Sequence, residues 1–484
     1  MSSSHAPGAP GKAAVTDHGP PELKRVMGAK LLLLFIMGDI LGTGVYALTG
    51  QVASQIGGAA WAPIIVAFAV ATVTAFSYLE LVTKYPGASG AALYTHKAFG
   101  VGFLTFMVTF AVLASGLTSA ATAAITVASN FNVGFGLDMP PVGVVSVAVV
   151  FMLILAAINI RGVSESVKLN VVLTLIELTG LLLVIFVGFW AMSQGTADFS
   201  QVTVFHTPED KSVFLVLTAV TSLAFFSFVG FEDSVNMVEE TKDPRNTFPK
   251  VMLGGLGICL VVYVLVSIFT VALVPIGVLG ESTTPLVEVV HRGAPGVPID
   301  SIYPFLTIFA VANTALINML MASRLLYGMA RQGVLPGFLG KVHPTRRTPW
   351  TSILFTTALA IALLTLVGLG MGKATATALG GTTALLLLGV FAIVNIALLV
   401  LRRDTSGAED HFRAPTPMPY IGAFTTAFLI GPWAQDPIEY QIAAILLAIG
   451  VALSVANWTY KRFAKHERMN FENPDELGNL GDVD

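Results

Sequence analysis

Long, nearly uninterrupted apolar blocks dominate this chain of 484 residues. Clear examples cover residues 142–160, 169–190, 251–274 and 442–458. Each is close to the roughly 20 residues that an α-helix needs to cross about 30 Å of hydrocarbon. Charged residues make up only 11% of the chain, whereas about 25% is usual in soluble domains. The pattern predicts an all-α membrane protein.

We expect twelve transmembrane helices, at 28–50, 59–84, 95–129, 142–160, 167–192, 213–240, 249–275, 303–331, 350–370, 376–401, 418–434 and 438–460. An even number puts both termini on one side of the membrane. If that side is the cytoplasm, 23 of the 26 Lys and Arg residues face inward, and only Lys211, Arg292 and Lys373 face outward. Because cytoplasmic loops are enriched in Lys and Arg, we predict a cell-membrane protein with both termini in the cytoplasm.

The two ends of the chain are polar. Residues 1–24 are rich in Ser, Ala, Gly and Pro, and residues 463–484 end in an acidic stretch, so we expect a disordered N-terminus and a solvated tail. The net charge of -3 implies no nucleic-acid partner. The expected partners are the lipid bilayer and a small solute, and the sequence carries no signal for an oligomeric state.

The first predicted span contains two glycines, Gly42 and Gly44, on either side of Thr43. Glycine in a helix interior costs about 1 kcal/mol relative to Ala, so the pair favours local unwinding. Unwound backbone at membrane depth is tolerated only where it is buried in protein or faces a wet cavity. Close helix packing through small residues is the alternative interpretation.

The sixth predicted span has a similar interruption. Gly230 is followed by Glu232 and Asp233 within what otherwise reads as one continuous helix. Glycine interruptions in corresponding spans of two halves are typical of inverted-repeat transporters and mark the binding site. Free amides at the start of a half-helix attract a carboxylate, and freed carbonyls accept hydrogen bonds from an ammonium group. Together the two breaks predict a site for an amino acid.

Three segments resemble motifs of the amino acid, polyamine and organocation permease superfamily, especially its cationic amino acid transporter and bacterial permease branches. They are Gly-Asp-Ile-Leu-Gly-Thr-Gly-Val-Tyr-Ala-Leu-Thr-Gly at 38–50, Phe-Phe-Ser-Phe-Val-Gly-Phe-Glu at 225–232 with Glu-Glu-Thr-Lys-Asp-Pro at 239–244, and Ser-Arg-Leu-Leu-Tyr-Gly-Met-Ala-Arg-Gln-Gly-Val-Leu-Pro at 323–336. The resemblance covers about residues 22–465. It implies a leucine-transporter-like fold, with one inverted repeat of five spans in 25–192, a second in 213–401, and two extra spans in 402–462. It also implies secondary active transport by alternating access.

The resemblance further implies a set of substrate-binding residues, namely Ile40, Gly42, Thr43, Gly44, Phe226, Val229 and Gly230. The amides of Thr43 and Gly44 would bind the substrate carboxylate. The carbonyls of Ile40, Phe226 and Val229 would accept from the α-amino group. The Phe226 ring resembles an aromatic cap over the substrate, whereas Phe228 and Phe231 are interpreted as packing residues.

Three acids, Asp39, Glu177 and Glu232, lie inside predicted spans. An acid at the bilayer centre costs about 2.5–3.5 kcal/mol on insertion scales, so we expect each to face water, a cation or a bound proton. Glu232 matches an acid of many relatives. It either links the sixth span to the inner side as a proton carrier or caps the second half-helix.

Glu177 departs from the family pattern, because many proton-coupled bacterial relatives carry a lysine there in place of a sodium ion. Glu177 could load the coupling proton, balance a sodium ion or a substrate ammonium, or form a structural hydrogen bond to the first span. We therefore expect no cofactor other than a coupling ion, H+ or Na+. Without a mid-membrane lysine the cavity should favour positive charge, so a cationic amino acid or a polyamine is preferred over a neutral amino acid.

Charged residues also cluster at the inner ends of the sixth and eighth spans. Ion pairs between Glu239 or Glu240 and Arg324 or Arg331 would close an inner gate, and solvated loop faces are the alternative. Other function classes have less support. The sequence has no P-loop motif, so we do not expect transport driven directly by ATP. Nutrient sensors of this fold usually carry a sizeable cytoplasmic extension, and the termini here are short. The eight histidines form no catalytic or metal-binding pattern, so an intramembrane enzyme is not supported.

Overall fold

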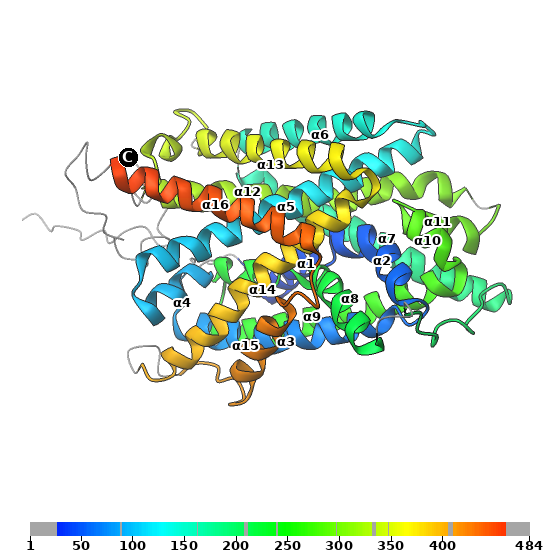
Figure 1. Cartoon of the computed structure of the whole chain (residues 1–484), viewed down its shortest axis with the longest axis horizontal. Helices are drawn as coiled ribbons and strands as arrows, with labels where there is room; N and C mark the ends of the chain where they lie inside the picture. The colour runs from blue at the N-terminus through cyan, green and yellow to red at the C-terminus, as the bar shows by residue number, and fades with distance from the viewer. Residues whose placement is uncertain are drawn as a thin grey trace, which may run out of the picture.

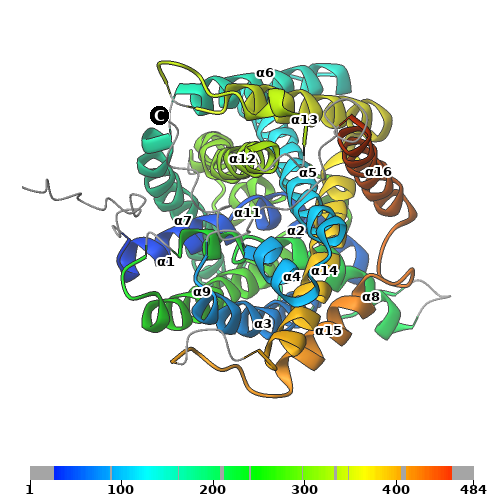
Figure 2. The same ribbon diagram turned by 90° about the vertical axis from the view of Figure 1, so that its left-hand side faces the viewer.

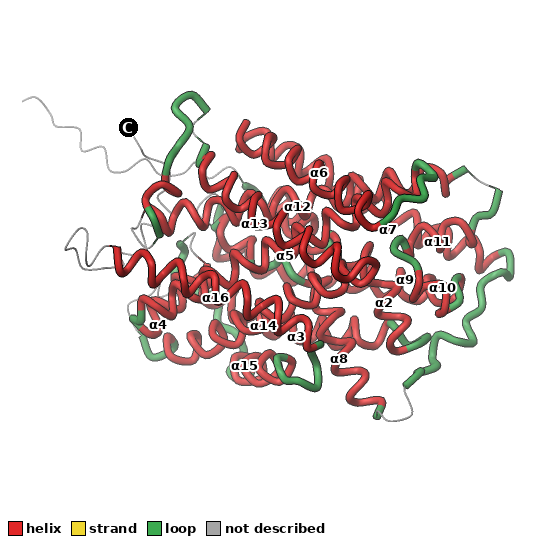
Figure 3. Tube along the Cα trace, turned by 45° about the horizontal axis from the view of Figure 1, so that its top comes forward, coloured by secondary structure: helices red, strands yellow, loops and turns green. Residues whose placement is uncertain are grey.

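The computed structural model describes residues 27–87, 90–161, 163–207, 212–238, 241–296, 298–331, 335–346, 348–404 and 410–460. Within these residues the regular structure is helical, with two isolated backbone bridges that join Met27 to Thr241 and Gly57 to Phe205 (Figure 3). The predicted disordered N-terminus (1–24) and cytoplasmic tail (463–484) lie outside the described residues, as do Glu239 and Glu240.

Ten segments of the described residues are long and apolar enough to cross a membrane. The helices that form these segments are α1 (Ala29–Ile40) with α2 (Thr43–Ile56), α3 (Trp61–Lys84), α5 (Gly102–Gly134), α6 (Pro141–Arg161), α7 (Val163–Ser193), α8 (Val213–Phe225) with the 3-10 turns η1 (Phe226–Phe228) and η2 (Asp233–Met237), α9 (Pro244–Leu273), α12 (Ile299–Arg331), α13 (Trp350–Met371) with α14 (Thr375–Leu401), and α16 (Pro437–Tyr460). The molecule is thus an integral membrane protein.

The predicted ninth and tenth spans fall within a single segment of 52 residues, Trp350–Leu401. Its two helices, α13 and α14, are separated by the short turn η4 (Gly372–Ala374), where Gly372 has a positive φ of 55°. The predicted eleventh span corresponds to the shorter helix α15 (Met418–Leu429).

One predicted boundary is wrong. The third span was expected at 95–129, but the structure ends a separate helix, α4 (Gly90–Phe99), before α5 begins at Gly102. Gly100 has φ 63°, a left-handed conformation that stops α4, and its N–H donates to the carbonyl of His96. The structure also adds two short helices between α9 and α12 that the sequence analysis did not place, α10 (Ile276–Glu281) and α11 (Pro285–Gly293).

The long helices run broadly along one axis of the molecule, with α6 and α13 at one edge and α3 and α15 at the opposite edge (Figure 1). Seen along that axis, α2 and α12 lie inside the bundle, and α6 and α16 lie at its periphery (Figure 2). Burial agrees with this arrangement. In the apolar stretch of Ala29–Ile56, 83% of the residues are buried, against 28% in α6 and 33% in α16. The first, interrupted segment is therefore protein-enclosed, and the outer helices offer apolar surface to lipid.

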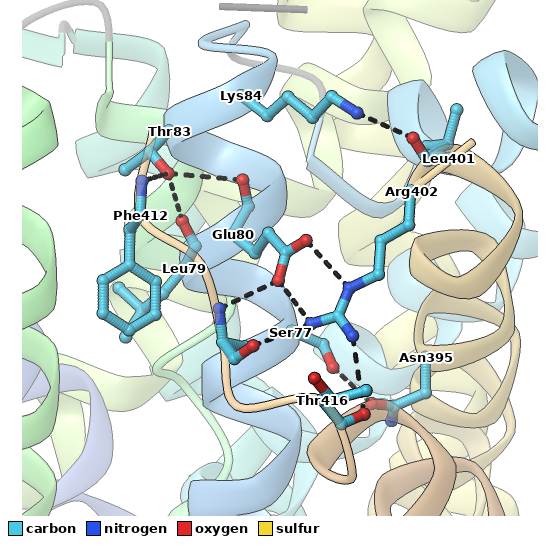
Figure 4. Close-up of polar contacts among 11 residues, drawn as sticks. Ser77, Leu79, Glu80, Thr83, Lys84, Asn395, Leu401, Arg402, Phe412 and Thr416 are labelled. Carbon is cyan, nitrogen blue, oxygen red and sulfur yellow. Dashed lines mark hydrogen bonds and ion pairs between the residues drawn. The ribbon is translucent and has the colours of Figure 1, made fainter. Parts of the chain in front are cut away.

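At one end of the bundle, an ion pair joins α3 to the residue that follows α14 (Figure 4). Arg402 donates through Nε to Oε1 of Glu80 at 2.9 Å and through Nη2 to Oε2 at 2.7 Å. The Glu80 side chain is only 3% exposed, and its Oε2 also accepts from the backbone N–H of Ala414 at 2.9 Å. This fork geometry satisfies both carboxylate oxygens, as a buried charge requires.

Neighbouring hydrogen bonds add to this ion pair between α3 and the end of α14. Lys84 Nζ donates to the carbonyls of Leu401 and Asp404 at 2.7 Å each, and so satisfies carbonyls at the end of α14. Farther along the same two helices, Ser77 Oγ donates to Oδ1 of Asn395 at 2.6 Å. The α3–α14 contact is therefore held by polar bonds over several turns.

We predict that Arg402→Gln lowers the free energy of unfolding by about 3 kcal/mol, because it leaves the Glu80 carboxylate buried without its counter-charge. Denaturant unfolding in detergent micelles measures the change. The matched control is Lys373→Gln, whose pair with Glu281 is 3.6 Å long with side chains 72% and 83% exposed. That control should stay within about 0.5 kcal/mol of the native chain. Equal losses in both variants would contradict the assignment.

Candidate functional site

The first membrane-crossing segment is interrupted at Leu41 and Gly42. α1 closes with the N–H of Leu41 donating to the carbonyl of Met37 at 2.8 Å. Gly42 then leaves the helical region, with φ -57° and ψ -141°, and α2 begins at Thr43. The interruption predicted from the two glycines is confirmed. It gives α1 a carboxyl end and α2 an amino end within the bundle, each with backbone groups that have no partner inside the helix.

The sixth segment is interrupted as well. α8 ends at Phe225, the chain turns through η1, and Val229 is extended with φ -65° and ψ 141°. Gly230 follows with φ 123°, which side chains other than glycine rarely adopt. The chain then resumes only as the 3-10 turn η2, so this predicted interruption is also confirmed.

The two interruptions pack directly against each other. A Cβ atom on Gly44 would lie 2.5 Å from Cα of Ser227, and one on Gly230 would lie 2.9 Å from the backbone carbonyl of Asp39. Neither distance leaves space for a methyl group. The absence of a side chain at Gly44 and Gly230 therefore allows the two interrupted segments to pack closely, in addition to its effect on helix propensity.

A cavity lies between these interruptions and the helices α5, α12 and α14. Its lining includes most of the predicted substrate-binding residues and two of the predicted acids, namely Asp39, Ile40, Thr43, Gly44, Phe226, Val229, Gly230 and Glu232. Gly42 does not line it, and packs instead against the side chain of Thr314. The structure thus brings together, in one enclosed space, residues that are nearly 200 positions apart in the sequence.

Several backbone groups predicted to bind substrate already have partners within the protein. The carbonyl of Ile40 accepts from the hydroxyl of Tyr263 at 2.5 Å. The N–H of Thr43 donates to Oγ1 of Thr314 at 3.2 Å. The carbonyl of Phe226 accepts from the N–H of Val229 at 3.3 Å. These three backbone groups are thus satisfied within the protein, as buried polar groups require.

The acids at the cavity differ in their environment. Asp39 is 4% exposed, and its Oδ2 has no hydrogen-bond partner among the described residues. Glu232 folds back so that its Oε2 accepts from the N–H of Gly230 at 2.9 Å. Gly230 precedes η2, and the Glu232 side chain makes no cap bond to that turn, so the predicted capping of the second half-helix is not seen among the described residues. The cavity also contains a third acid, Asp233, which the sequence analysis left out of its candidate site.

Glu177 lies in α7 and does not line the cavity. It is fully buried beside the side chain of Asn313, and neither carboxylate oxygen has a well-formed hydrogen bond to a described residue. Only its backbone carbonyl is bonded to the first segment, by the hydroxyl of Tyr46 at 2.7 Å. The side-chain hydrogen bond to that segment, one of the alternatives for Glu177, is absent from the described residues.

A polar cluster connects the region of Glu177 to α1. Asn313 Nδ2 donates to the carbonyl of Gly38 and to Oγ1 of Thr174, at 3.3 Å in each case. Asn170 Nδ2 donates to Oδ1 of Asn313 at 3.1 Å. These bonds tie α7 and α12 to the end of α1, on the same segment that carries the cavity residue Asp39.

The predicted inner-gate pairs stay a prediction, because Glu239 and Glu240 lie outside the described residues. Arg324 lies in α12 and is partly buried, and Arg331 ends that helix with its side chain exposed. The well-formed ion pair that the structure does describe, between Glu80 and Arg402, was not anticipated from the sequence.

The aromatic residues around the second interruption divide into two groups. Phe226 lines the cavity and contacts α14 at Gly380. Phe228 and Phe231 are completely buried, and their rings pack on Tyr263 at 5.3 Å and on Phe391 at 5.4 Å between centroids. The interpretation of Phe228 and Phe231 as packing residues is confirmed.

Three further helices supply cavity residues that the sequence analysis missed. They are Ser115, Gly116 and Ser119 in α5, Thr314, Asn318 and Met321 in α12, and Thr383 in α14. Their spacing offers a signal, because residues three and four apart share one helix face. Small and polar residues on one face of an otherwise apolar span indicate a surface that faces protein or water instead of lipid.

A helical membrane protein with a central cavity between two interrupted helices belongs to the broken-helix class of solute carriers. The comparison with known families is consistent with that class. The chain belongs to the amino acid permease family, whose model matches residues 30–459. The resemblance noted from the three sequence motifs is thereby confirmed.

Individual relatives are similar along most of their length. The chain is 27% identical over 481 residues to a methylthioribose transporter of Bacillus subtilis (strain 168), covering 93% of this chain and 95% of the relative. It is 26% identical to the branched-chain amino acid permease BcaP of the same organism, covering 93% and 96%. It is 27% identical to the chloroplastic cationic amino acid transporter 9 of Arabidopsis thaliana, covering 69% and 60%. These relatives are transporters of different solutes.

We predict that Gly44→Ala destabilises the protein by about 1–3 kcal/mol, since the added methyl group would overlap Ser227. Gly254→Ala in α9 is the matched control, because nothing lies within 4 Å of its added Cβ. There the helix propensity of Ala should stabilise the fold by up to about 1 kcal/mol. Unfolding in detergent should therefore give changes of opposite sign, and a stabilised Gly44→Ala variant would disprove the contact.

Proposed function

We propose that this permease is a secondary active transporter that carries an amino acid through the central cavity by alternating access. The observation that supports this function best is the direct packing of two interrupted helices around an enclosed, acid-lined cavity. Such a site offers helix ends of both polarities to one small molecule. Transport by this route needs no cofactor other than a coupling ion.

The complete topology belongs to the same proposal. We infer twelve spans, with α13, α14 and α15 each crossing the membrane, arranged as five plus five inverted spans followed by two more. The interruptions in the first and sixth spans support this arrangement, because they occupy corresponding positions in the two repeats. The distribution of Lys and Arg supports cytoplasmic termini in a cell membrane.

Substrate binding would exchange existing contacts for new ones. The carboxylate would take the first amides of α2, at Thr43 and Gly44, where the helix dipole favours negative charge. The ammonium group would lie near the carbonyls of Ile40 and Val229 and the free Oδ2 of Asp39. A charge-assisted hydrogen bond is stronger than a neutral one, so the substrate can displace the neutral hydroxyls that now occupy these groups.

A cationic substrate is the proposed preference. Asp39, Glu232 and Asp233 line the cavity, and none of the described lining residues is Lys or Arg. Uncompensated carboxylates in a low-dielectric space create a negative potential that attracts a second positive charge on the substrate. Arginine, lysine or a small polyamine would meet that requirement.

We predict that labelled L-arginine uptake into proteoliposomes is inhibited by lysine and putrescine more than by leucine and serine. Asp39→Asn should weaken arginine uptake at least about tenfold more than leucine uptake, because the variant removes one negative charge close to the substrate. Asp198→Asn, at a fully exposed loop residue, is the matched control and should leave the ratio unchanged. Inhibition by leucine or serine alone overturns the cationic preference.

A second candidate substrate is a neutral thiosugar. One relative is a methylthioribose transporter, and the cavity wall contributed by α5, α12 and α14 carries hydroxyl and amide groups at Ser115, Ser119, Asn318 and Thr383. These groups could bind sugar hydroxyls. Methylthioribose therefore belongs among the competitors in the uptake experiment, and inhibition by it alone would favour this candidate.

We propose that Glu177 carries the coupling proton. A gradient of one pH unit is worth about 1.4 kcal/mol, or tenfold accumulation for each proton transported. We predict that the native chain accumulates arginine when such a gradient is imposed and that Glu177→Gln does not, although it still exchanges arginine across the membrane. Glu281→Gln, at the exposed last residue of α10, is the control for the loss of a carboxylate elsewhere in the chain. Undiminished accumulation in Glu177→Gln excludes this role.

A further inference from the structure

Thr314 in α12 makes an unusual contact with the first interruption. Its Oγ1 accepts a hydrogen bond of 3.2 Å from the backbone N–H of Thr43, and both residues are buried. Thr43 is the first residue of α2. Helix geometry leaves the N–H groups of the first turn without acceptors inside the helix. A hydroxyl from a different helix, 271 positions away in the sequence, takes that role here.

Gly42 provides the space for this contact. A Cβ atom on Gly42 would lie 1.9 Å from Oγ1 of Thr314, so any larger residue at position 42 would displace the hydroxyl. Thr314 also lines the central cavity, together with Thr43 and Gly44. The hydroxyl therefore lies at the edge of the cavity and occupies the amide that the proposed function assigns to the substrate carboxylate.

We propose that Thr314 is a placeholder for the substrate carboxylate. In the empty carrier its hydroxyl satisfies the N–H of Thr43, and on loading the carboxylate replaces it. A carboxylate is the stronger acceptor, so the exchange favours binding. The displaced hydroxyl can turn to the carbonyl of Ala310, four residues earlier, as Thr commonly does inside helices. This inference rests on the proposed function, because it requires a substrate that carries a carboxylate.

The exchange would give Thr314 a positioning role in the transport cycle. While the carrier is empty, the bond ties α2 to α12, and loading releases that tie. Thr314 is thus distinct from the residues that hold the substrate. Removing its hydroxyl should strengthen binding, because an empty site would then leave a buried N–H without an acceptor, which raises the free energy of the empty state alone.

Binding of L-arginine, L-leucine and the amines that result from their decarboxylation to the purified full-length protein in nanodiscs tests the proposal. Thr314→Val and Thr314→Ala should each bind the preferred amino acid about five- to tenfold more tightly than the native chain. Thr314→Ser, which keeps the acceptor, should bind like the native chain. Thr307→Val, at a buried residue of the same helix that does not line the cavity, is the control for loss of a hydroxyl.

The decarboxylated amines distinguish a placeholder from a merely structural residue. Because they have no acceptor for the N–H of Thr43, their affinity should change less than twofold in Thr314→Val, so the tighter binding depends on the carboxylate. Weaker or unchanged binding of the amino acids in both Thr314→Val and Thr314→Ala overturns the placeholder role while leaving the proposed function in place. If the native chain binds neither amino acid, the proposed function fails and this inference fails with it.

Discussion

The backbone groups exposed at the two helix interruptions must be satisfied without bulk water, and the arrangement of the core follows from that requirement. An unpaired peptide group costs several kcal/mol in hydrocarbon. The structure places the two interruptions against each other through Gly44 and Gly230, and side chains from α9 and α12 take groups that remain. Two of these partners, Tyr263 and Thr314, are neutral hydroxyls, which form weaker hydrogen bonds than a charged group would.

The helix α14 links this site to one end of the bundle. It lines the cavity at Thr383, whose Oγ1 lies 2.6 Å from that of Thr118 in α5, and its last turn is held to α3 by Lys84 and by Arg402 with Glu80. A neutral hydroxyl contact is easily exchanged, whereas a buried fork-shaped ion pair is costly to separate. In the proposed transport cycle, the polar contact of α14 with α5 at Thr383 would therefore exchange more readily than its polar contacts with α3.

Sequence patterns predicted the long apolar helices and both interruptions, because span length and glycine placement are local properties. The partners that complete the site were not predictable in this way. Tyr263 and Thr314 reach Ile40 and Thr43 from 223 and 271 positions away, and the pair of Glu80 with Arg402 spans 322 positions. Such contacts depend on how the helices pack. The predicted start of the third span was wrong for a local reason. Gly100 has a left-handed conformation and ends a helix within a stretch of sequence that otherwise looks continuous.

The three acids singled out in the sequence, Asp39, Glu177 and Glu232, differ in ways that composition does not reveal. One carboxylate oxygen of Glu232 accepts a hydrogen bond from the N–H of Gly230, so this side chain stabilises the backbone of the interruption. Asp39 lines the cavity and has an oxygen without a partner among the described residues, and Glu177 is buried beside Asn313, outside the cavity lining. A carboxylate next to the substrate is suited to hold an amine, whereas one behind α1 can take up a proton without contacting the substrate. Binding and coupling would then be carried by separate acids, joined through the bonds from Asn313 to Gly38 and from Tyr46 to the carbonyl of Glu177.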